Sequence, residues 1–175
     1  MFNILAITVA VFVAAVLVSA ATKPDAFRVQ RTMTMKATPE RIVPLIENFY
    51  IWRSWSPFER KLDPALKRAH SGSARGKGAV YAWEGNGKAG AGRMEIIDSS
   101  SSQVTIKLDL IKPVEGHNIA EFTLEPRGDS TNVTWALRGP SPYLAKVATT
   151  FFNMDRVVGS EFETGLANLK AIAER

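Results

Sequence analysis

The chain has 175 residues, which suits one domain of ordinary size with a substantial core, and it shows no internal repeat. It contains no cysteine, which excludes disulfide frameworks and most zinc sites. The formal net charge of +5 favours acidic partners, and we predict anionic lipid headgroups rather than nucleic acid.

Residues 2–21 form an uncharged stretch with few polar side chains, which are those of Asn3, Thr8 and Ser19. Twenty residues in a helix extend about 30 Å, which matches the hydrocarbon thickness of a bilayer. We therefore predict a single-pass transmembrane anchor at residues 1–21.

A cleaved signal peptide, leading to export, is the alternative for this stretch. Val18-Ser19-Ala20 resembles a small-residue cleavage site, but the first residues include no Lys or Arg and the apolar run is long. The basic residues Lys23, Arg28 and Arg31 follow the stretch, so the positive-inside rule favours a domain on the cytoplasmic side.

Residues 22–26 include Lys23-Pro24-Asp25 and are predicted to be a short linker before a domain at residues 27–175. Residues 27–36 alternate between apolar and polar side chains, which indicates a strand with one solvated face. Its apolar residues are Phe27, Val29, Met33 and Met35. Arg31 breaks the alternation, either as an inward charge or as a device at the edge of a sheet.

Residues 37–58 predict two short helices that end in a corner. Thr38-Pro39-Glu40 is typical of a helix start, and Pro44 shortens or kinks the helix. The apolar residues recur at helical spacing: Ile42, Leu45, Ile46 and Phe49. Trp52 and Trp55 follow, and Ser56-Pro57 ends helical geometry, so both tryptophans are held on a tight turn.

Residues 59–77 carry more basic than acidic side chains, with one irregular strand expected around residues 66–70. The basic residues are Arg60, Lys61, Lys67, Arg68, Arg75 and Lys77. A solvated loop explains this pattern, and contact with anionic headgroups of a nearby membrane is the alternative.

An antiparallel meander is predicted to follow. Strands are expected at residues 79–84 and 90–98, joined by a hairpin at Asn86-Gly87, and three more strands run to residue 137. The predicted inward side chains include Tyr81, Trp83, Gly92, Met94, Ile96, Val104, Ile106, Leu108, Leu110, Asn118, Ala120, Phe122, Leu124, Val133, Trp135 and Leu137.

A single long helix is predicted from about residue 143 to residue 173, after Gly139-Pro140-Ser141-Pro142. Its apolar stripe consists of Phe151, Met154, Val158, Phe162, Leu166, Leu169 and Ala173. The stripe is long enough to cover a whole sheet.

This order of elements resembles the START-like helix-grip superfamily (SRPBCC), in its polyketide cyclase/dehydrase-like subgroup, over roughly residues 27–174. The matching pieces are residues 37–40, residues 52–58, Gly78 with Tyr81, Trp83 and Gly85, residues 131–135 and residues 154–169. The resemblance implies an α+β helix-grip fold, in which a curved antiparallel sheet wraps around a long C-terminal helix, with two short helices after the first strand. It also implies that a hydrophobic ligand is held between sheet and helix.

Catalytic residues are not predicted, because the inward rows are almost wholly apolar. We predict a binding module for a small hydrophobic ligand, such as a lipid or a polycyclic, polyketide-like compound, with no cofactor and no metal site. The predicted ligand-binding residues are Trp52, Trp55, Tyr81, Trp83, Met94, Phe122, Trp135, Phe151, Met154 and Phe162. They would wall a cleft of roughly 300 to 1,000 Å³.

Two alternatives stay open at this point. One is a cyclase, dehydratase or hydrolase that acts on a hydrophobic substrate. The other is an interaction domain whose pocket is filled by its own side chains. The sequence does not indicate an oligomeric state.

Overall fold

The computed structural model describes residues 2–60, 66–85 and 90–175. Lys61 and the Asn86-Gly87 hairpin therefore lie outside the described residues. The helices are α1 (Phe2–Ala21), α2 (Pro39–Ile46), α3 (Trp52–Trp55), α4 (Pro57–Arg60), α5 (Tyr143–Ala148) and α6 (Met154–Ala173). The strands are β1 (Ala26–Met35), β2 (Lys67–Gly72), β3 (Ala79–Glu84), β4 (Ala91–Ser99), β5 (Gln103–Lys112), β6 (Gly116–Arg127) and β7 (Ser130–Pro140).

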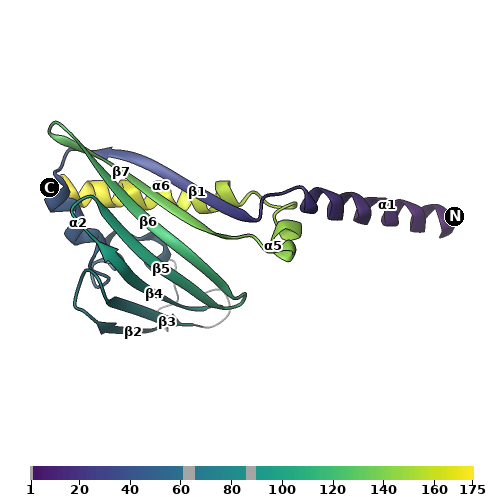
Figure 1. Ribbon diagram of the computed structural model, residues 1–175, viewed down its shortest axis with the longest axis horizontal. Coiled ribbons are helices and arrows are strands. Elements are labelled where there is room, and N and C mark those ends of the chain that lie inside the picture. The colour runs from purple at the N-terminus through teal and green to yellow at the C-terminus, as the bar shows by residue number, and fades with distance from the viewer. Residues whose placement is uncertain (1, 61–65, 86–89) are drawn as a thin grey trace.

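Seven antiparallel strands form one curved sheet in the order β1-β7-β6-β5-β4-β3-β2 (Figure 1). Strands β2 to β7 follow one another as hairpin neighbours, and β1 joins the far edge by pairing with β7 along its whole length. Helix α6 packs across the sheet beside β1, and α2, α3 and α4 lie against α6. This arrangement is the predicted α+β helix-grip fold.

The predicted alternation of strand β1 is confirmed. Val29 and Met35 are buried, while the neighbouring polar side chains are exposed. Arg31 points to the same side as Val29 and lies against α6, where it forms ion pairs with Asp155 and Glu163. It is therefore an inward charge, held by two carboxylates of the helix.

The prediction of one continuous C-terminal helix is wrong between residues 149 and 153. Helix α5 ends where the hydroxyl groups of Thr149 and Thr150 donate to the carbonyl oxygen of Lys146. Helix α6 then begins after Asn153, whose side-chain oxygen accepts a hydrogen bond from the backbone N–H of Arg156. Since Asn at this position satisfies a free backbone donor, it starts a new helix.

Candidate functional site

The inward face of the sheet consists of side-chain rows that cross the strands. The row of Ile96, Ile106 and Ala120 is buried, and so is the next row, formed by Val104, Phe122 and Trp135. Both rows lie beneath the short helices and α6, which supply Ile42, Ile46, Leu166 and Leu169 to the same buried cluster. This half of the interior is a packed core.

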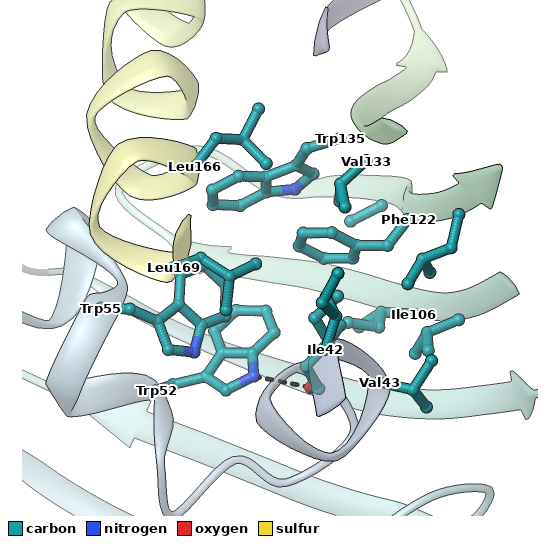
Figure 2. Close-up of a cluster of buried hydrophobic side chains, with 14 of the residues drawn as sticks. Ile42, Val43, Trp52, Trp55, Ile106, Phe122, Val133, Trp135, Leu166 and Leu169 are labelled. Carbon is teal, nitrogen blue, oxygen red and sulfur yellow. Dashed lines mark hydrogen bonds between the residues drawn. The ribbon is translucent and has the colours of Figure 1, made fainter. Parts of the chain in front are cut away.

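Aromatic rings fill the centre of this core (Figure 2). The ring of Trp135 is stacked between Phe162, with 4.1 Å between ring centroids, and Phe122, at 4.9 Å. Trp52 and Trp55 meet the same stack edge-on, with centroid distances to Trp135 of 6.4 Å and 5.6 Å. The five rings leave little free space between sheet and helix at this level.

The indole N–H groups of Trp52 and Trp55 also bind backbone carbonyl groups at the C-terminal end of helix α2. The last carbonyl groups of a helix have no partner within the helix. Trp52 Nε1 donates to the carbonyl oxygen of Ile46 at 2.8 Å, and Trp55 Nε1 donates to that of Leu45 at 3.0 Å. The tryptophan corner is thus fixed by hydrogen bonds as well as by packing. Trp135 Nε1 is buried and has no hydrogen-bond acceptor among the described residues.

A buried polar group lies beside the core on strand β3. The Tyr81 hydroxyl donates to Glu59 Oε1 at 2.5 Å, and Arg68 Nε donates to Glu59 Oε2 at 3.1 Å. Burial, followed by the contact with Glu59, raises the pKa of Tyr81, so the phenol stays protonated. Burial lowers the pKa of the neighbouring His70, whose ring stacks on Tyr50. The proton of the neutral phenol is thus already donated to a carboxylate that Arg68 compensates.

Sequence reasoning identified Tyr81 but not Glu59 or Arg68, which it placed in a solvated segment. The sequence did contain one signal for Arg68. Arg68 and His70 are two residues apart in the expected strand, so their side chains share a face. Register pairs Arg68 with Trp83 and His70 with Tyr81, so β2 presents these two side chains on the inward face of its neighbour. Glu59 lies in α4 and carried no comparable signal.

The inward rows near the other end of the strands are only partly covered. One row joins Tyr81, Met94 and Leu108 to the buried Asn118, and the next joins Trp83, Gly92 and Leu110. The apolar side chains that are left half-buried are those of Trp83, Met94, Leu108 and Leu110. They form a partly exposed apolar surface, which we call the open rows.

Gly92 allows the ring of Trp83 to lie flat on strand β4. A Cβ atom at residue 92 would come within 2.4 Å of the Trp83 indole. The two residues are also direct partners across the strands. The orientation of Trp83 on the open rows therefore depends on glycine at this position.

The remaining predicted residues lie at different places. Phe151 is 65% exposed in the segment between α5 and α6, and the structure does not bring it to the aromatic core. Met154 is half-buried at the start of α6.

A cleft of about 470 Å³ lies at the ends of β2 to β5, but much of its lining, such as Ala82 and Arg93, belongs to outward positions of the sheet.

The sequence over residues 26–174 matches the family model described as polyketide cyclase / dehydrase and lipid transport. The chain belongs to this family. No curated protein has a matching sequence. Members of this family share a fold that is associated with binding hydrophobic ligands, which agrees with the apolar concave face described above.

Solved structures with this fold are distant in sequence. A Chromobacterium violaceum protein is 14% identical, with a TM-score of 0.58, and the match covers 87% of this chain and 99% of that chain. The Aha1 dimer of Colwellia psychrerythraea has the same identity and TM-score, with 85% and 96% covered. DynU16, of the dynemicin biosynthetic locus, is 12% identical with a TM-score of 0.55, and the match covers 85% of this chain and 47% of that chain. At these identities the likeness concerns the fold alone.

Proposed function

We propose that the protein is a membrane-anchored binding module that holds the apolar part of a small hydrophobic ligand against the open rows. The observation that carries this proposal is the contrast between the two halves of the concave face. One half is filled by its own rings, whereas Trp83, Met94, Leu108 and Leu110 remain half-buried on inward positions. Inward apolar side chains that the protein leaves partly uncovered are typical of a ligand site.

The ligand chemistry follows from the groups around these rows. Burial of apolar surface contributes about 0.8 kcal/mol per CH₂ group, so an acyl chain or a flat ring system gains most from this wall. The Tyr81–Glu59–Arg68 cluster and the buried Asn118 amide lie beside the apolar side chains. The Asn118 amide, and the Tyr81 and Glu59 oxygens as acceptors, would orient one polar group of the ligand. The aromatic core, with Trp52, Trp55 and Trp135, would form the floor of the site.

Membrane anchoring through α1 is the second part of the proposal. The helix over Asn3–Ala21 has a mean hydropathy of 2.8, and 6% of it is buried in the protein. It is long enough to cross a bilayer, and a signal sequence has the same character. Retention of α1 is supported by its contact with the folded domain at α5, where the Tyr143 hydroxyl donates to the carbonyl oxygen of Leu17.

An enzymatic role is the second candidate, and the Tyr81–Glu59 pair is the observation that favours it. A cyclase or dehydratase needs a proton donor and an acceptor near the substrate, and this pair could supply both. Its two groups already satisfy each other, however, which disfavours proton transfer to a substrate and leaves their oxygens as hydrogen-bond acceptors. The third class, an interaction domain with a self-filled pocket, is consistent with the ring stack around Trp135.

The test is saturable binding to the full-length protein in detergent, measured by titration calorimetry with fatty acids of increasing chain length and with a flat polycyclic compound. The Met94→Trp variant fills the open rows, and we expect it to weaken binding at least tenfold. Ile97→Trp is the matched control, because Ile97 is an exposed residue on the same strand. Binding that Met94→Trp leaves unchanged, or the absence of saturable binding by any of these compounds, would overturn the proposed site.

A further inference from the structure

A group of exposed apolar side chains lies where α5 meets α6. The residues are Tyr143, Leu144, Phe151, Phe152 and Val157, which we call the junction patch. Leu144 is 81% exposed and Phe151 is 65% exposed, although each is large and apolar. A concentration of such residues on one short segment indicates a surface that is covered in the working state of the protein.

The junction patch is fixed beside the last turns of α1. The Tyr143 hydroxyl donates to the carbonyl oxygen of Leu17 at 2.9 Å, and Ala20 is fully buried. The Lys23 ammonium group holds the end of α5 by donating to the carbonyl oxygen of Lys146 and to the hydroxyl of Thr150. Figure 1 shows α5 next to the end of α1 from which the domain begins.

These contacts set the depth of α5 relative to the apolar helix. Leu17 precedes the end of α1 by four residues, which is roughly 6 Å of helix. If residues 3–21 span the bilayer, Tyr143 lies within the boundary between headgroups and acyl chains. Tyrosine is enriched at that depth because its ring is apolar and its hydroxyl is polar.

The charges near the patch favour the same surface. The carboxylate of Asp25 is neutralised by Lys146, whose hydrogen bond lowers the pKa of Asp25. Arg31 pairs with both Asp155 and Glu163, and its hydrogen bond lowers the pKa of Asp155. Arg156, in the first turn of α6, is exposed. The four basic groups Lys23, Arg31, Lys146 and Arg156 therefore exceed the three acidic groups Asp25, Asp155 and Glu163 by one charge, which favours anionic headgroups.

We propose that the junction patch inserts into the interfacial layer of the bilayer that α1 spans. The inference rests on the proposed membrane anchoring. It is favoured over a protein partner because the patch adjoins the apolar helix α1 through Tyr143 and lies at the depth that the span itself fixes. It makes α5 a second membrane contact beside α1 and orients the domain relative to the bilayer.

The absence of cysteine allows a direct test in the full-length chain. Single cysteines at Phe151→Cys, Phe12→Cys and Ser101→Cys are labelled with a fluorophore that responds to polarity, and the protein is reconstituted into phosphatidylcholine/phosphatidylglycerol vesicles. Phe12 is an exposed residue of α1 and reports insertion of the span. Ser101 is exposed in the turn between β4 and β5, away from α5, and reports water.

We expect labels at residues 12 and 151 to emit at shorter wavelength than the label at residue 101, and to be quenched several-fold more by brominated lipid. A shielded label at residue 12 with a water-like label at residue 151 would overturn the junction patch while leaving the anchor intact. Water-like labels at both positions would overturn the anchor and, with it, this inference. A label at residue 151 that is shielded yet not quenched by brominated lipid would indicate a protein contact and also overturn the proposal.

Discussion

Glu59 is a buried carboxylate whose two oxygens are each satisfied by a different neighbour. Tyr81 donates to one oxygen and Arg68 to the other. A buried acceptor that loses its donor costs about 1 to 3 kcal/mol, whereas an exposed hydroxyl contributes little. The contribution of this hydrogen bond to the free energy of unfolding can therefore be measured by removing the hydroxyl oxygen of Tyr81.

We expect Tyr81→Phe to lower the free energy of unfolding by about 1 to 3 kcal/mol, because it leaves Glu59 Oε1 without its phenol donor. The measurement is chemical unfolding of the full-length protein in detergent. Tyr50→Phe is the control, since Tyr50 is 61% exposed and the same atom is removed. Equal effects of the two substitutions would show that the buried hydrogen bond adds no stability.

Individual residues show which side-chain positions could be predicted from the sequence alone. Alternation placed Val29, Trp135 and Tyr81 on inward faces because a strand has a period of two. It could not decide the role of Arg31, because its partners Asp155 and Glu163 are more than 120 residues away in the chain. Contacts of that range follow from the packing of α6 on β1 and leave no local pattern.

At the scale of elements, helix α6 approaches the sheet through two glycines that face different neighbours. A Cβ atom at Gly159 would meet the guanidinium group of Arg31 at 2.0 Å. A Cβ atom at Gly165 would meet the ring of Trp135 at 2.7 Å and the ring of Pro57 at 3.0 Å. The first neighbour is the end of a flexible side chain, and the second two are rigid rings.

We expect Gly165→Ala to lower the free energy of unfolding by about 1 to 3 kcal/mol, because α6 must move away from packed rings. Gly159→Ala should stay within about 1 kcal/mol of the parent protein, since the helix gains roughly 0.5 to 1 kcal/mol from alanine while Arg31 shifts. Thermal unfolding of both variants provides the comparison. A Gly165→Ala variant as stable as Gly159→Ala would mean that α6 is not seated closely on Trp135.

The break between α5 and α6 shows why the length of a helix is hard to predict. The apolar spacing of Phe151, Met154 and Val158 continues through the break, so the periodicity gave no sign of it. The local signal was Asn153 followed by Asp155, an N-cap and a first-turn carboxylate. The long apolar stripe concealed this start signal.

At the scale of the whole molecule, α1 and the domain share a small contact through α5. We expect a chain of residues 22–175 to fold with an intact sheet and α6, because Ala20 is the one residue of α1 buried among the side chains that the structure describes. Helix α5 should exchange its amide hydrogens faster in this chain, since Tyr143 loses its acceptor at Leu17. Hydrogen exchange followed by mass spectrometry compares the two chains.

Unchanged protection of residues 143–148 in the shorter chain would show that α5 is held by the domain alone. Loss of protection throughout the sheet would show instead that α1 is needed for folding. Slower exchange in β6 and β7 serves as the internal reference, because both strands are paired on each side.

The family and the fold were predictable because they depend on the order of elements and on short motifs such as the tryptophan corner. The candidate site was predictable only in part. Tyr81, Trp83 and Met94 lie on one concave face as alternation indicated, but which part of that face is filled depends on the stacking of Phe162 on Trp135. Such packing is a property of the whole fold, and a single sequence does not reveal it.

The linker between α1 and β1 limits where this domain can work. It consists of residues 22–25, which reach at most roughly 14 Å when fully extended, and the backbone N–H of Ser141 binds the carbonyl oxygen of Asp25. If α1 spans a bilayer as proposed, this tether keeps the domain from travelling to a second bilayer as a diffusible shuttle would. Under that proposal, the domain meets ligands and partners only at one membrane, and its encounters with other membrane-bound molecules are confined to two dimensions.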